Sequence, residues 1–292
     1  MTAQLLSTSE GQTLVLTLSN PEFRNALGPE MYAAGVEALN VAESSSEVRS
    51  VVITGANGIF SAGGNLQRLQ NNRQLPPEHQ AQSIEGLHNW IEAIRTFPKP
   101  VIAAVEGPAA GAGFSLALAC DMIVAARNSV FVMAYSSIAL SPDGGGSWSL
   151  SRAMPRQLAT ELLMCGERIG AERLQQLGVV NRLTDPAQAL SEALKLATAL
   201  NSRAPNAMAS IKELLADADG IVVVEREKLP GLLPLADKLG AALGASSERD
   251  SSGGSCEVSV PLCAPSRPRG NLRAQYADPT SRSSPNLRPL AG

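Results

Sequence analysis

The spacing of hydrophobic residues changes repeatedly along the first hundred positions. Residues Thr13–Leu18 alternate apolar and polar side chains and are rich in β-branched residues, which predicts a strand. After a break at "SNPEF", apolar residues recur at helical spacing over positions 28–43. Arg49–Gly55 and Val101–Val105 are short apolar runs that predict buried strands. Strands and helices therefore alternate along this half of the chain.

The same alternation continues toward the C-terminus. An amphipathic helix is predicted over Ser83–Phe97, after a polar segment at 72–80 that we expect to be mobile and on the surface. Further helices are expected to about Ala119 and over residues 66–72, 147–165, 170–177 and 186–218, and further strands over Met122–Ala126 and "VFVMA". The pattern predicts an α/β fold built from repeated β-β-α or β-α-β units.

The last part of the chain has a different composition. From about Ser246 the sequence is rich in Ser, Pro, Arg and Gly and has little apolar periodicity. Such a segment cannot bury enough apolar surface to offset chain entropy, so we expect it to be disordered or extended. The sequence therefore predicts three regions, namely a core over 1–200, a helical C-terminal region over 201–245 and a low-complexity tail over 246–292.

Composition excludes several function classes. A net charge of −3 and only 3% aromatic residues argue against nucleic-acid binding and against a membrane-surface role. The four cysteines form no CxxC pair and have no neighbouring histidine, so neither a metal site nor a disulfide framework is expected. No apolar run is long enough to span a bilayer, and the N-terminus does not resemble a signal peptide. We therefore expect a cytoplasmic protein.

Two loops share one design, in which an apolar strand leads through small residues into a helix. They are "VVITGANGIFSAGGNL" and "VIAAVEGPAAGAGFSLAL". The first amides of a helix lack intrahelical partners, and small residues allow another molecule to approach them closely. Two such loops side by side could offer two N–H groups to one oxygen as an oxyanion hole. The alternative is that Gly and Ala serve only close packing of strand on helix. A dinucleotide site is excluded in the second loop because Leu116 stands where the third glycine should be.

The motifs, taken in order, resemble the enoyl-CoA hydratase/isomerase, or crotonase, superfamily over about residues 10–215. They are "NPEFRNAL", "VVITGANGIFSAGGNL", "KPVIAAVEGPAAGAGFSLALACDMIVA" and "LSPDGGGSWSLSRAMPRQLATELLMCGERIGAERLQQLGVVNRL". The resemblance implies a spiral core of repeated ββα units with a C-terminal helical region. It also implies an acyl-CoA thioester substrate that itself carries coenzyme A, without a separate cofactor, and a homotrimer or dimer of trimers. The chain is most similar to the branch linked to degradation of phenylacetate-type, ring-derived CoA thioesters.

The resemblance also implies site residues. The two oxyanion donors would be the amides of Gly64 and Ala112. Coenzyme A would contact the stretch around Arg24, with Arg24 as a phosphate partner, and the loop Ala62–Leu66. The predicted contacts are Arg24, Ala26, Ala62, Asn65, Leu66 and Gly111.

The acid and base groups depart from the hydratase pattern. Ser115 and Tyr135 stand where hydratases of the superfamily have their two glutamates. Asp143, in "LSPDGGGSW", stands where several isomerases have an aspartate that moves a proton between carbons. We therefore expect an isomerase with Asp143 as proton shuttle. An atypical hydratase and a non-catalytic acyl-CoA-binding homologue remain alternatives, and Asp143 could instead serve a turn or a helix cap.

The resemblance is lost after about Asp219. Relatives end in amphipathic helices that cover the acyl pocket, whereas Pro230 and Pro234 interrupt any long helix here. We hypothesise a frameshift relative to the relatives, against the alternatives of a functional disordered segment or a lineage-specific replacement.

Overall fold

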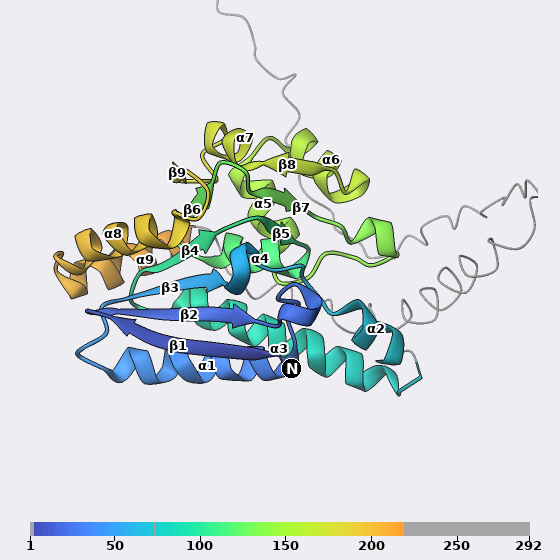
Figure 1. The fold of residues 1–292 in the computed structure, drawn as a ribbon, viewed down its shortest axis with the longest axis horizontal. Coiled ribbons are helices and arrows are strands. Elements are labelled where there is room, and N and C mark those ends of the chain that lie inside the picture. Colours follow the sequence, from blue (N-terminus) through green and yellow to red (C-terminus); the bar gives the residue numbers. More distant parts are fainter. Residues whose placement is uncertain (1–2, 73, 219–292) are drawn as a thin grey trace, which may run out of the picture. The chain divides into compact units, whose positions relative to one another are not determined.

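A computed structural model describes residues 3–72 and 74–218 of the chain. Its main sheet has six strands in the order β1-β2-β3-β4-β6-β9, and β1 pairs antiparallel with β2 while the others run parallel (Figure 1). These strands are Gln4–Glu10, Thr13–Ser19, Ser50–Gly55, Val101–Val105, Met122–Ala126 and Arg182–Thr184. A smaller sheet has the order β5-β7-β8 and consists of Pro108–Ala110, Val130–Val132 and Arg168–Gly170. The predicted α/β class is confirmed.

Helices cover both faces of the main sheet, which explains why its central strands are largely apolar and buried. On one face, Ile53 and Ala103 pack in the cluster that includes α1 (Pro29–Ser44) and α3 (Pro77–Thr96). On the other face, Val52 and Ile102 pack against α8 (Ala189–Asn201). Every residue of β4 is consequently buried.

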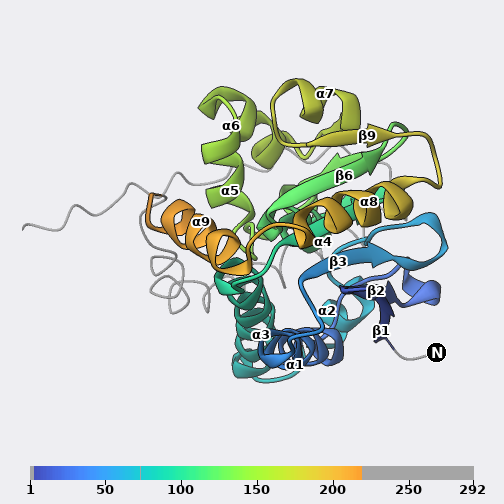
Figure 2. The same ribbon diagram turned by 90° about the vertical axis from the view of Figure 1, so that its left-hand side faces the viewer.

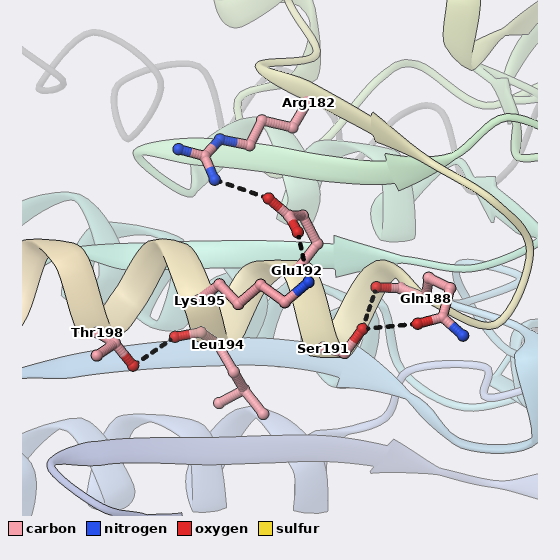
Figure 3. Close-up of polar contacts among 7 residues, drawn as sticks. All are labelled: Arg182, Gln188, Ser191, Glu192, Leu194, Lys195 and Thr198. Atoms are coloured by element: carbon pink, nitrogen blue, oxygen red, sulfur yellow. Dashed lines mark hydrogen bonds and ion pairs between the residues drawn. The ribbon is translucent and has the colours of Figure 1, made fainter.

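The outer surface of α8 is polar, and ion pairs connect it to the sheet edge. Arg182 of β9 lies 2.8 Å from the Glu192 carboxylate, which also lies 3.3 Å from Lys195 (Figure 3). The start of α8 is held by Glu106, whose Oε1 accepts a hydrogen bond of 2.8 Å from the Ala189 amide. A carboxylate at this end satisfies an unpaired amide and complements the helix dipole.

Helix α9 (Pro205–Ala218) lies beside α3 (Figure 2). Its Lys212 donates a hydrogen bond of 2.7 Å to Asp121 Oδ2, and that oxygen also accepts one of 2.7 Å from the Val101 amide. Burial raises the pKa of Asp121, while the Lys212 ammonium acts to lower it. Lys212 therefore compensates a carboxylate that ties the start of β4 to the start of β6.

The boundaries of several observed helices differ from the predicted ones at proline residues. The helix predicted from Ser83 begins earlier, at Pro77, inside the segment 72–80 that was expected on the surface; proline is well suited to a first helical turn. The helix predicted over 147–165 is two helices, α5 (Gly146–Ala153) and α6 (Arg156–Cys165), which are separated at Pro155. The helix predicted over 186–218 likewise divides into α8 and α9 before Pro205. Proline lacks the N–H that would continue a helix and disfavours helical geometry in the residue before it.

Strands β1, β5, β8 and β9 were absent from the sequence-based prediction. β1 is an exposed edge strand, and β5, β8 and β9 have three residues each. Strands of these kinds carry little periodicity of their own and form through pairing with β2, β7 and β6. The remaining helices are α2 (Leu66–Asn72), α4 (Ala112–Ala119) and α7 (Ala171–Gln176), close to their predicted positions.

The predicted regions beyond residue 218 lie outside the described residues. These are the greater part of the helical region 201–245, the tail 246–292 and the hypothesised frameshift after Asp219. The boundary predicted at 200/201 falls at the end of α8 and stays a prediction. Within residues 3–72 and 74–218, no helix is long and apolar enough to cross a membrane.

Candidate active site

The two small-residue loops lie against each other. Ser61 and Ala109 form a parallel bridge, in which the Ser61 amide donates to the Pro108 carbonyl at 3.1 Å and the Ala110 amide donates to the Ser61 carbonyl at 2.9 Å. The loop after β3 therefore runs beside β5, the strand that leads into α4. The side-by-side arrangement expected from the sequence is present.

Two glycines make this close approach possible. A Cβ atom at Gly63, where φ is +88°, would lie 2.5 Å from the Ala110 carbonyl oxygen. A Cβ atom at Gly113 would lie 2.7 Å from Ser61 Cβ and 2.9 Å from both Ser61 oxygens. Real side chains do not tolerate such distances, so these positions require glycine. Close packing thus explains why positions 63 and 113 are glycine, but it does not explain why the neighbouring amides, those of Gly64 and Ala112, lack hydrogen-bond acceptors among residues 3–72 and 74–218.

The amides of Gly64 and Ala112 are the ones that the resemblance assigns to an oxyanion hole. Ala112 is the first residue of α4, where no intrahelical acceptor exists for its N–H. Within the described part of the chain, neither amide donates a hydrogen bond to a protein acceptor. The two loops therefore present two amides that remain available to a ligand oxygen.

A third segment joins the two loops. The Ala62 amide donates to the Arg24 carbonyl at 2.9 Å, and the Leu27 amide donates to the Gly63 carbonyl at 2.7 Å. Asn25 anchors the segment, because its Nδ2 donates to the carbonyls of Ala56 and Ile59 at 2.8 and 2.7 Å. The stretch predicted to bind coenzyme A is thus brought beside the loop that carries Gly64.

The predicted coenzyme A contacts differ in what they leave accessible. Arg24 and Leu66 are exposed, Ala62 is half-buried, and Asn65 Oδ1 accepts a hydrogen bond of 3.1 Å from the Arg68 amide at the start of α2. Ala26 is buried, and its amide and carbonyl bond to Phe23 and Asn20. The Gly111 amide donates to the Val132 carbonyl at 2.8 Å. Ala26 and Gly111 therefore use these backbone groups within the protein rather than offering them to a ligand.

Asp143 lies in a cluster of hydroxyl groups. Tyr135 Oη donates a hydrogen bond of 2.5 Å to Asp143 Oδ1, and Ser115 Oγ donates one of 3.0 Å to the Asp143 carbonyl. The two hydroxyl oxygens are 3.4 Å apart. Ser115 lies on α4, and Tyr135 and Asp143 lie in the segment between β7 and α5. The two positions that hydratases fill with glutamate are thus both in contact with Asp143.

Tyr135 is held as a neutral hydrogen-bond donor. Its side chain is buried, and burial together with the nearby Asp143 carboxylate raises its pKa well above the ordinary value. A Cβ atom at Gly111 would lie 3.8 Å from Tyr135 Cζ, so the phenol ring packs beside the residue that precedes Ala112. Asp143 is therefore linked through one hydroxyl group to the loop that carries Ala112.

Two residues near the site went unnoticed in the sequence. Arg68 lies on α2, one turn after Gly64, and its Nε and Nη1 atoms are buried without a partner among the described residues. Burial raises the pKa of Tyr32 to about 12, and the Arg68 guanidinium opposes that rise. No local pattern marks either residue, because Tyr32 is one apolar position of a helix and Arg68 is one charge on a polar helix.

The geometry defines a class: an α/β protein in which two strand–loop–helix junctions lie side by side, each with a backbone amide that donates to no acceptor among the described residues, and in which a carboxylate contacts the Tyr135 hydroxyl beside one of these loops. The sequence profile of the enoyl-CoA hydratase/isomerase family matches residues 8–221. The chain belongs to this family, as its motifs predicted.

Characterised relatives and solved structures agree. The chain is 36% identical over 216 residues to the 1,2-epoxyphenylacetyl-CoA isomerase of Escherichia coli K12, which covers 74% of this chain and 82% of that protein. It is 32% identical over 260 residues to an E. coli carnitinyl-CoA dehydratase, covering 86% and 98%. The crystal structure of an enoyl-CoA hydratase from Polaromonas sp. JS666 is similar with a TM-score of 0.73 and 63% identity, over 84% of this chain and 97% of that one. The chain is therefore an enzyme of the hydratase/isomerase family.

Proposed function

We propose that this enzyme isomerises an unsaturated or ring-derived acyl-CoA thioester, with Asp143 as the proton shuttle. The observation that carries the proposal is the contact from Asp143 through Tyr135 to the loop of Ala112. It puts the carboxylate on the same structural unit as an oxyanion donor.

The proposed reaction moves one proton and one double bond. The thioester carbonyl oxygen accepts hydrogen bonds from the Gly64 and Ala112 amides, and the Asp143 carboxylate removes a proton from a carbon of the acyl group. The electron pair of the broken C–H bond forms a dienolate, whose oxygen carries the negative charge and is stabilised by the two amides. Asp143, now protonated, returns the proton to a different carbon. Substrate and product have the same mass, and no water is consumed.

Hydration is the less suitable chemistry for this site. Addition of water needs groups that orient the water and transfer its protons, and Ser115 and Tyr135 offer hydroxyls that already contact Asp143. The glycines of the neighbouring loop lie close against Ser115. A Cβ atom at Gly144 would already lie 3.1 Å from Ser115 Cβ, and one at Gly146 would lie 2.6 Å from its Oγ.

The relatives support a ring-derived substrate. The E. coli protein at 36% identity is named for an epoxide of phenylacetyl-CoA, and the name states an isomerisation. Other relatives are named as hydratases or dehydratases, so the activity must be measured directly.

The test is a panel of enoyl-CoA and ring-CoA thioesters, followed by absorbance and by mass spectrometry. Isomerisation shifts the chromophore at constant mass, whereas hydration adds one water. Asp143→Asn should lower kcat by about 10³-fold or more while acyl-CoA affinity, measured by calorimetry, is kept. Asp185→Asn, at an exposed aspartate, serves as the matched control.

Three outcomes would contradict the proposal. Addition of water would identify a hydratase. Activity of the Asp143→Asn variant within tenfold of the wild-type protein would exclude Asp143 as the shuttle. Tight acyl-CoA binding without turnover of any thioester would identify a non-catalytic homologue. The expected trimer, the cytoplasmic location and the absence of a separate cofactor stay predictions; light scattering at micromolar concentration tests the first.

A further inference from the structure

We propose that Tyr135 and Ser115 are positioning residues that together hold Asp143 in its reactive orientation. Tyr135 bonds to the carboxylate and Ser115 bonds to the main chain of the same residue, at 2.5 and 3.0 Å. This inference rests on the proposed function, and its test separates the two.

The segment that carries Asp143 needs such support. Gly144 and Gly145 follow it with φ of +58° and +73°, a left-handed conformation that glycine adopts freely but does not select over others. The backbone alone therefore leaves the direction of the Asp143 side chain weakly determined. A hydrogen bond to Oδ1 and another to the carbonyl fix the side chain and the main chain at once.

Both hydroxyl groups are themselves held rigidly. Ser115 is 1% exposed and Tyr135 is 5% exposed. Ser115 lies in the first turn of α4, after the oxyanion residue Ala112, and its amide donates to the Gly111 carbonyl at 3.0 Å. The Ser115 hydroxyl on α4 and the Tyr135 phenol beside Gly111 thus fix the position of Asp143 relative to the loop that carries Ala112.

The phenol contact also influences the charge state of the carboxylate, because Asp143 Oδ1 accepts the hydrogen bond from Tyr135 Oη. Because the Tyr135 phenol stays protonated, it remains a donor through the catalytic cycle and supports the ionised form of Asp143. Loss of this contact should slow the chemical step and leave substrate binding unchanged, since neither hydroxyl is required to hold coenzyme A.

The experiment measures kcat and KM for four variants on the thioester that the wild-type protein isomerises. Tyr135→Phe deletes one hydroxyl and keeps the ring; we expect kcat to fall about 10²-fold with KM within about twofold, because small misplacement of a catalytic group has effects of that size. Ser115→Ala should lower kcat by about tenfold. Tyr135→Phe combined with Asp143→Asn should be no slower than Asp143→Asn alone, since residues that act through one group are not additive.

Ser129→Ala is the matched control. Ser129 is also 1% exposed and also donates to a backbone carbonyl, that of Val105, at 3.0 Å, but the structure places it in the turn between β6 and β7. We expect it to lower the melting temperature about as much as Ser115→Ala and to leave kcat unchanged. A melting curve of each variant shows whether it folds, and if Tyr135→Phe does not fold, Ser115→Ala alone decides.

The outcomes separate this inference from the proposed function. If Asp143→Asn is inactive while Tyr135→Phe and Ser115→Ala keep kcat within twofold, the positioning role is wrong and the shuttle stands. If Tyr135→Phe lowers kcat further in the Asp143→Asn background, Tyr135 acts independently of Asp143 and the inference is overturned. If Asp143→Asn keeps its activity, the proposed function itself fails.

Discussion

The contact between Gly113 and Ser61 yields a sharp prediction about the oxyanion site. Replacing Gly113 with alanine adds one methyl group, whose carbon would lie 2.7 Å from Ser61 Cβ. Carbon atoms pack at about 3.5–4.0 Å, so the two loops must separate by about 1 Å. Ser61 cannot turn away easily, because its Oγ donates to the Asn25 carbonyl at 2.8 Å and accepts from the Gly63 amide at 3.1 Å.

The expected cost has a structural and a catalytic part. Overpacking of a buried site typically destabilises a protein by about 1–3 kcal/mol. Separation of the loops also displaces the Gly64 amide from the Ala112 amide, and loss of one oxyanion donor lowers kcat by about 10²–10³-fold. We therefore expect Gly113→Ala to lower kcat at least 10²-fold while the protein remains folded.

The assay is steady-state turnover of an acyl-CoA substrate, together with thermal unfolding. Gly170→Ala is the matched control. Gly170 precedes α7 with φ of −80°, and among the described residues no atom beyond its chain neighbours lies within 4 Å of the place that a methyl group would take. It should change the free energy of unfolding by less than about 0.5 kcal/mol and leave kcat intact. If Gly113→Ala retained kcat within twofold, the two loops would not be a rigid unit and the oxyanion assignment would lose its structural basis.

Three further predictions concern stability and reactivity. Lys212→Met removes the ammonium that pairs with the Asp121 carboxylate and should lower the free energy of unfolding by about 1–3 kcal/mol in urea denaturation. Lys195→Met, at an exposed ion pair, should change the free energy of unfolding by less than about 0.5 kcal/mol. Equal effects of the two substitutions would contradict the stronger contribution of the Lys212 ion pair. Burial raises the pKa of Tyr32 to about 12, so its contribution to stability is present below the ordinary pKa of 10.0 and is lost as pH rises toward 12. Tyr32→Phe should therefore reduce the loss of stability between pH 10 and pH 12. If the free energy of unfolding of this variant fell with pH as steeply as that of the wild-type protein, the raised pKa of Tyr32 would be contradicted. The exposed Cys165 should react readily with a maleimide, whereas Cys120, whose thiol is buried and has a raised pKa, should react only on unfolding. Peptide mapping identifies which of the two cysteines is labelled, and labelling of Cys120 in the folded protein would contradict its burial.

The amino-acid sequence by itself determined the elements whose signal is local. The strands Ser50–Gly55 and Val101–Val105 and helix α1 follow from the spacing of apolar residues, and the two small-residue loops follow from their place between a strand and a helix. These features depend on neighbours within a few positions, so the chain reveals them without tertiary contacts. The helices around Pro77, Pro155 and Pro205 were misplaced although the prolines are visible, because proline can begin a helix as well as end one.

Only the tertiary structure decided the features that join distant positions. The sequence identified Ser115, Tyr135 and Asp143 separately, but their hydrogen bonds join residues up to 28 positions apart and depend on how α4 packs beside the segment before α5. β5 and β8 exist only because β7 supplies the hydrogen-bond partners for both. Gly113 requires glycine because Ser61, far away in the chain, lies where a methyl group would go. Burial and contact are properties of the folded chain, so no local sequence pattern encodes them. It is the contacts of Asp143 with Tyr135 and Ser115 that make this aspartate of a glycine-rich turn a candidate proton shuttle.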